Sequence, residues 1–216
     1  MASVDSVDPI TRRTNGSSAT LRSTWAVAAA VTMLMSLPLA VVSQVLGEDA
    51  PQVVVHLVLT IGMLLFVKAI FDFGLPRWIN VIGALSAALF GVVFLLQAVS
   101  SLVPQNAALD EFAFGLLGNW PEHLLVLGTD VWFVGLLLLG SEGRTRLIGW
   151  AIVPVATAYH LISVAGAVLA ITVPSLGVFA LLLPFVWLLI EGAKRSAPEA
   201  LGPRHPGTEP VEMPTA

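Results

Sequence analysis

The chain of 216 residues contains no cysteine and little charge: 11% of its residues are charged, against about a quarter in an ordinary soluble domain. The lack of cysteine excludes disulfides, thiolate metal sites and cysteine nucleophiles. A water-soluble fold with so few charged residues would not cover its own surface, so lipid must solvate most of the chain. The few, scattered basic residues also exclude the electrostatic footprint of a nucleic-acid-binding protein.

The sequence does contain long apolar runs: 56% of its residues are apolar, and its mean hydropathy is +0.89. A helix needs about 20 apolar residues to cross the hydrocarbon core of a bilayer. Backbone amides in hydrocarbon must be paired within their own segment, which favours helices over strands. We therefore predict an all-α, polytopic transmembrane bundle with about six spans. The predicted spans are 24–46, 53–72, 78–102, 121–140, 147–172 and 174–193.

The spans form one predicted transmembrane domain, 23–194, between two polar tails. The N-terminal segment 1–22 carries Ser, Asp and Thr, and the C-terminal segment 195–216 is rich in proline. Neither composition supplies enough apolar surface to bury a core, so both tails are predicted to be disordered.

The basic residues predict the orientation of the bundle. All Lys and Arg lie in the two tails or beside the connections after the second and fourth spans, and therefore on one side. The opposite side carries Glu48, Asp49, Asp110, Glu111 and Glu122 without a basic residue. Because cytoplasmic segments are enriched in Lys and Arg, this split predicts a cell-membrane protein with both termini in the cytoplasm.

The third predicted span carries small residues at four-residue spacing: Gly83, Ala87 and Gly91. Small residues in this register let a second helix approach closely, which is how helices associate in lipid. The partner is either another span of the same chain or a neighbouring chain, in a homo-oligomer or in a complex with other membrane subunits.

Ionisable residues at membrane depth are the default functional candidates, because burying them in hydrocarbon is costly. The spans hold His56, Asp130 and His160, of which Asp130 and His160 lie well inside the span ends. Lys68 and Glu191 lie near the cytoplasmic boundary, where long side chains reach water, and are therefore not candidates.

Asp130 and His160 are expected to meet in one polar cavity. At about 1.5 Å per residue they lie roughly 13 and 18 Å from the outer ends of adjacent, antiparallel spans. Thr157 and Ser163 add hydroxyl groups near His160, and Gln97 can join them from the third span. The pair is either a hydrogen-bonded tie between two helices or a site for a proton or small solute.

His56 and His123 lie near the outer ends of their spans. They are either ordinary interfacial residues or an outer ligand pair, for which haem b is the candidate cofactor. The sequence has no Cys-x-x-Cys-His and no His-Glu-x-x-His motif, so no metal site is predicted.

These features favour a non-enzymatic integral membrane protein, either an accessory subunit or a protein that acts on a small solute or a proton. The alternative is a membrane redox or haem-binding subunit. A membrane-embedded metal hydrolase is a third interpretation, which the missing paired helical histidines disfavour.

The predicted orientation can be tested by single-cysteine labelling in intact cells. Residues introduced at 47–51 and 103–120 should react with an impermeant reagent from outside, because those segments lie on the acidic side. Residues at 141–146 should react only after the membrane is opened. Labelling of residue 110 from the cytoplasm would overturn the orientation.

Overall fold

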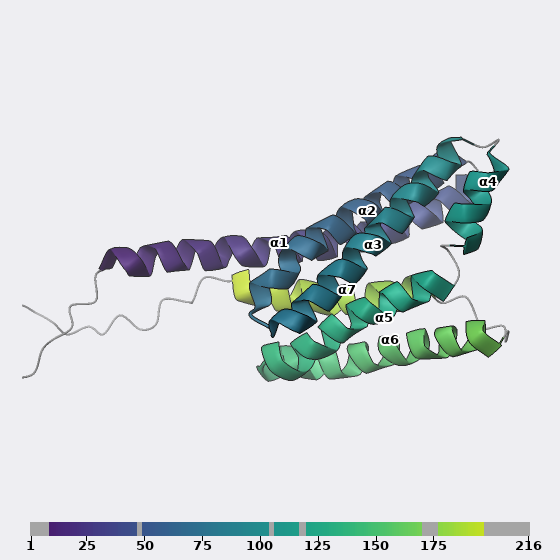
Figure 1. Cartoon of the computed structure of the whole chain (residues 1–216). Helices are drawn as coiled ribbons and strands as arrows, with labels where there is room; N and C mark the ends of the chain where they lie inside the picture. The colour runs from purple at the N-terminus through teal and green to yellow at the C-terminus, as the bar shows by residue number, and fades with distance from the viewer. Residues whose placement is uncertain (1–8, 47–48, 104–105, 117–119, 170–176, 197–216) are drawn as a thin grey trace, which may run out of the picture.

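The structure, a computed structural model, describes residues 9–46, 49–103, 106–116, 120–169 and 177–196, and every regular element in these ranges is helical. Within the described ranges, four short helical segments extend or connect the long helices, which Figure 1 shows. In order the elements are α1 (Pro9–Leu46), α2 (Asp49–Ile70), η1 (Phe71–Phe73), α3 (Arg77–Leu102), α4 (Ala107–Asp110), η2 (Glu111–Leu116), α5 (Trp120–Gly135), η3 (Leu136–Gly140), α6 (Gly143–Leu169) and α7 (Gly177–Ser196).

Five helices in the described chain are long and apolar enough to cross a membrane. The sixth predicted span corresponds to α7, whose last turns carry Glu191, Lys194 and Arg195 and which is not among the five. The all-helical fold and its membrane-spanning character therefore agree with the sequence prediction. The five segments are Thr24–Ser43, Gln52–Phe73, Arg77–Leu102, Glu122–Gly140 and Gly143–Gly166.

Helix α1 begins at Pro9, well before the predicted first span, and so includes most of the segment expected to be a disordered tail. A helix that is already nucleated adds further residues at little cost, and the apolar part of α1 provides that nucleus. Residues 1–8 and 197–216, which hold the rest of the two predicted tails, lie outside the described ranges.

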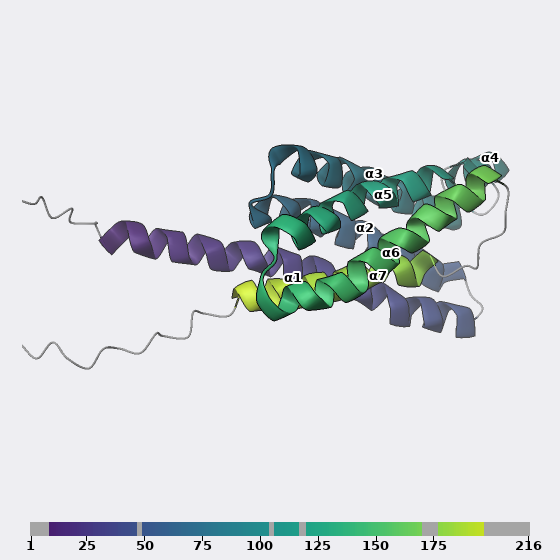
Figure 2. The ribbon, with the colours of Figure 1, turned by 90° about the horizontal axis from the view of Figure 1, so that it is seen from below.

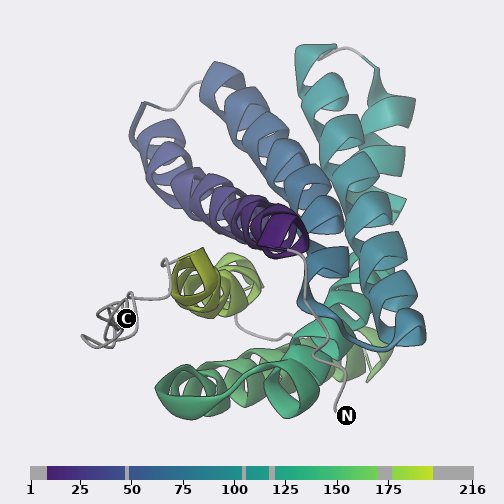
Figure 3. The same ribbon diagram turned by 90° about the vertical axis from the view of Figure 1, so that its left-hand side faces the viewer.

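The long helices pack in a closed ring. Each helix packs mainly against the one before and the one after it in the order α1, α2, α3, α5, α6, α7, and α7 returns to α1. The end-on view shows α7 between α1 and the α5–α6 pair (Figure 3), and the view from below shows α6 crossing α7 (Figure 2). Antiparallel α5 and α6 therefore lie side by side with α3 and α7 on their flanks.

Aromatic side chains fill the centre of this ring. Phe66 of α2 packs edge-on against Trp132 at 5.0 Å between ring centroids, stacks on Phe133 at 5.3 Å and contacts Phe185 of α7 at 5.1 Å. All four rings are almost completely buried. Since hydrocarbon is as apolar as these side chains, their contribution comes from close packing and ring geometry rather than from removal from water.

The small residues of α3 bring it close to its two neighbours in the ring. A Cβ atom on Gly83 would lie 2.7 Å from Cβ of Trp132, and one on Gly91 would lie 3.4 Å from Cβ of Met63. Ala87 is fully buried between these positions. The partners of this stripe are therefore α5 and α2 of the same chain.

These two glycines give a matched pair of variants. Gly83→Ala should destabilise the protein by about 1–3 kcal/mol, because the new methyl group overlaps Cβ of Trp132, which cannot move without its backbone. Gly91→Ala should be neutral or slightly stabilising, because its methyl group meets only ordinary contacts and alanine favours the helix. Thermal unfolding in detergent measures both. Equal unfolding temperatures of the two variants would contradict the packing of Gly83 on α5.

Candidate functional site: a buried Asp–His pair and an inner polar network

Asp130 and His160 are in direct contact between α5 and α6. Nδ1 of His160 lies 2.7 Å from Oδ2 of Asp130. The exposed fraction of the side chain is 4% for His160 and 3% for Asp130. A short connection joins the two helices antiparallel, which brings residues at matching depth together. At this separation the contact has the length of a charge-assisted hydrogen bond.

The pair is only partly satisfied by the protein. Nε2 of His160 and Oγ1 of Thr157 are buried, and neither has a hydrogen-bond partner among the described residues. The contact with His160 is also the one hydrogen bond that the side chain of Asp130 makes within the described chain. The pair and its nearest hydroxyl group therefore retain hydrogen-bonding capacity that a purely structural tie would use.

Two of the predicted cavity residues have other partners. Nε2 of Gln97 donates to the carbonyl oxygen of Ala113 at 3.4 Å, which ties α3 to η2. The hydroxyl of Ser163 donates to the carbonyl of Tyr159 on its own helix at 2.9 Å. Thr157, in contrast, borders the same surface cavity as Asp130.

This cavity has a volume of about 510 Å³ and lies where α5 is flanked by α3 and α6. Its lining is apolar apart from Asp130 and Thr157. The lining residues are Trp78, Ile79, Leu127, Asp130, Val131, Val134, Gly135, Leu138, Leu139, Thr157 and Leu161.

The predicted outer pair is divided between two environments. His56 packs against Phe94 and Phe114, with ring centroids 6.3 and 5.9 Å away. His123 lies on α5 within electrostatic range of His160. In the described chain no hydrogen bond or ring contact joins His56 to His123.

One buried polar contact was not predicted from the sequence. Asn80 accepts a hydrogen bond from Nε1 of Trp132 at 3.1 Å and donates to the carbonyl of Leu75 at 3.1 Å. Asn80 therefore fixes the indole of Trp132, which lies next to Gly83 and fills part of the centre of the helix ring. A survey of neutral amides as well as ionisable groups within the spans would have indicated Asn80.

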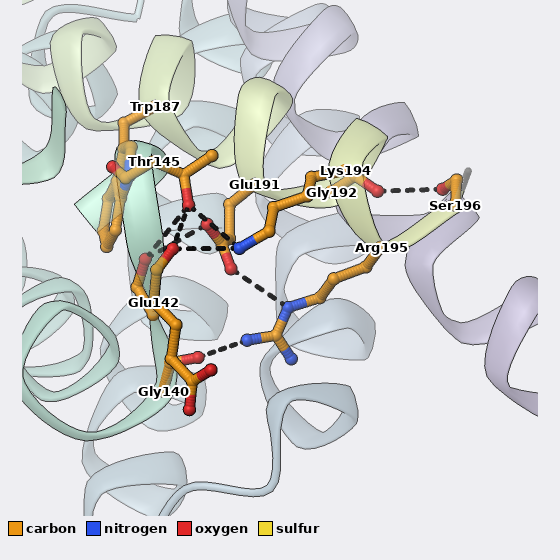
Figure 4. A network of polar contacts seen from close by, with 10 residues as sticks. Gly140, Glu142, Thr145, Trp187, Glu191, Gly192, Lys194, Arg195 and Ser196 are labelled. Carbon is orange, nitrogen blue, oxygen red and sulfur yellow. Dashed lines mark hydrogen bonds and ion pairs between the residues drawn. The ribbon is translucent and has the colours of Figure 1, made fainter. Parts of the chain in front are cut away.

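Glu191 corrects a sequence-based expectation: it does not reach water but is buried, with 1% of its side chain exposed. Ser141 donates to its Oε2 at 3.1 Å, and Nε of Arg195 donates to its Oε1 at 3.2 Å (Figure 4). Arg195 also donates to the carbonyl of Gly140 and lies over the ring of Phe73. The carboxylate is held inside because these donors replace water. In the sequence, the signal for this contact was the spacing of Glu191 and Arg195, which lie one helical turn apart.

The same network fastens the connection between α5 and α6 to α7. Lys194 donates to the carbonyl of Glu142 at 2.9 Å, and Nε1 of Trp187 donates to the carbonyl of Thr145 at 2.8 Å (Figure 4). Cationic side chains near free carbonyl groups at a helix end are favourable. This network therefore fixes the connected ends of α5 and α6, the two helices that carry Asp130 and His160.

Comparisons with known proteins add no family to this geometry. No protein-family model matches the chain, and neither the curated proteins nor the solved structures give a match. Within the described residues no group of three or more His, Cys, Asp and Glu side chains is placed to hold a metal ion.

The inner network predicts a coupling between Glu191 and Arg195. Glu191→Gln should destabilise the protein by about 1–3 kcal/mol, because Ser141 and Arg195 lose their charged acceptor at a buried position. The double variant with Glu191→Gln and Arg195→Gln should be destabilised by less than the sum of the two single variants. Thermal unfolding in detergent gives all three values. Glu142→Gln is the control, since its side chain is exposed and only its carbonyl joins the network; strict additivity would contradict the coupling.

Proposed function

We propose that this chain is a six-span protein of the cell membrane, with both termini in the cytoplasm, that binds and transfers protons through Asp130 and His160. No cofactor is needed for this activity. The proposal rests on the incomplete hydrogen bonding of the pair.

The orientation is supported by the arrangement of the helix ends. The connections α2–α3 and α5–α6 lie at the end of the bundle from which the start of α1 and the end of α7 project (Figure 1). Arg77, Arg144, Arg146, Lys194 and Arg195 lie at this end. The clustering of positive charge makes it the cytoplasmic end.

The observation that carries the proton-binding proposal is the buried Nε2 of His160 without a protein partner. Imidazole exchanges protons near neutral pH, and its two ring nitrogens can receive a proton on one side and release it on the other. Nδ1 is oriented by Asp130, which leaves Nε2 to exchange protons with water or with another group. His123, which lies on the same helix as Asp130 and feels the charge of His160, is one candidate for that group.

The haem-binding alternative requires two imidazoles on facing helices at matching depth. His56 lies among aromatic rings and His123 lies near His160, so the geometry favours the proton-binding proposal. An absorption spectrum of the purified protein separates the two, since bound haem gives an intense Soret band.

The proton proposal is tested in liposomes that contain the purified protein and a trapped pH-sensitive dye. A potassium diffusion potential should drive protons into wild-type vesicles faster than into empty ones. Asp130→Asn should abolish this excess, because an amide keeps a hydrogen bond to the imidazole but cannot exchange a proton or carry charge. Unfolding in detergent should change little, which distinguishes lost activity from lost fold.

Ser163→Ala serves as the control, because its hydroxyl lies on the same helix and is bonded to its own backbone. It should leave the proton flux unchanged. Wild-type flux equal to that of empty vesicles, or an Asp130→Asn flux equal to that of wild type, would leave the pair as a structural tie.

A further inference from the structure

We propose that the cavity beside Asp130 binds a neutral lipophilic molecule that carries a hydroxyl group, and that this molecule enters from the bilayer. The inference deepens the proposed function because the hydroxyl would contact the same Asp–His pair. Its test uses binding alone, so that it stands or falls separately from proton transfer.

The size and lining of the cavity suit a lipid-soluble molecule. Its volume of about 510 Å³ lies within the range of small-molecule sites, about 300–1,000 Å³. Leu, Val, Ile and Trp side chains from α3, α5 and α6 make up nearly all of its wall. A molecule that fills it must therefore be largely apolar.

Asp130 supplies the polar contact of the cavity. It comes from α5 and borders the cavity together with Thr157 of α6, whose hydroxyl oxygen is itself buried. Oδ2 of Asp130 is bonded to His160, which leaves Oδ1 to accept a hydrogen bond from a hydroxyl group of the ligand. A few placed polar groups in an apolar wall are what orient a ligand in such sites.

The existing partner of Asp130 bears on the choice between a neutral and a cationic ligand. Nδ1 of His160 lies 2.7 Å from Oδ2 of Asp130, so the carboxyl group already has a hydrogen-bonding partner in the protein. A cationic head group would add a net positive charge at membrane depth, which is costly. A hydroxyl group satisfies the free hydrogen-bonding capacity and adds no charge.

The route of entry follows from which lining residues are exposed. Trp78, Val131, Leu138 and Leu161 line the cavity and are large, exposed apolar side chains. They lie on segments apolar enough to span a membrane, so the surface around them faces lipid. The ligand therefore comes from the acyl-chain region and not from the aqueous phase.

The test is photolabelling of the full chain in lipid nanodiscs with a long-chain alcohol that carries a diazirine near its hydroxyl end. Mass spectrometry should locate the label on cavity residues of α5 and α6. The alcohol should label them several times more than the matching diazirine alkane, and excess unlabelled alcohol should suppress the signal.

A matched pair of variants on α6 distinguishes the cavity from the rest of the lipid-facing surface. Leu161→Trp fills the cavity and should remove the labelling, whereas Leu147→Trp, at an exposed position outside the cavity, should not. Equal labelling by the alkane would mean that ordinary lipid chains fill the cavity, and stronger labelling by a trimethylammonium analogue would mean a site for lipophilic cations. Either result overturns the proposal and leaves the proton-flux test unaffected.

Discussion

Hydrocarbon offers no hydrogen bond, and the arrangement of this chain follows from that constraint. It requires each long apolar run to be a helix, and it makes a polar side chain without a hydrogen-bond partner costly. Asn80 bonds the indole of Trp132, and Glu191 accepts from Ser141 and Arg195. These contacts join α3 to α5 and α7 to the end of η3, and so fix the helices between which Asp130 and His160 meet.

Close packing supplies what the hydrophobic effect cannot supply in lipid. Gly83 allows Trp132 to approach α3, and Gly128 and Gly135 allow α5 to approach Ser86 and Ile79. The two helices therefore interlock along their length. Trp132 and Phe133 of α5 pack into the buried centre of the ring, whereas Asp130, Val131 and Val134 of the same helix border the cavity.

Five of the six predicted spans correspond to helices long and apolar enough to cross a membrane, because this signal is local: an apolar run of sufficient length admits one structure in lipid. The sequence also predicted the meeting of Asp130 and His160, since a short connection places residues of equal depth on adjacent helices. It was wrong about Glu191, because depth along a helix does not tell which way a side chain turns around it. The partner of Gln97 and the cavity beside Asp130 depend on how separate helices are rotated, which no single span encodes.

The difference between the two polar clusters is the strongest argument that they serve different purposes. At the inner end, both oxygens of Glu191 are bonded, and the carbonyl groups of Gly140, Glu142 and Thr145 each have a donor. That is the complete pairing expected of groups that only hold a structure together. Around His160, buried atoms of the imidazole and of Thr157 have no protein partner in the described chain, and Nδ1 of His56 is a further atom of this kind. Buried groups left unpaired cost stability, and our proposal that Asp130 and His160 exchange protons would account for their retention.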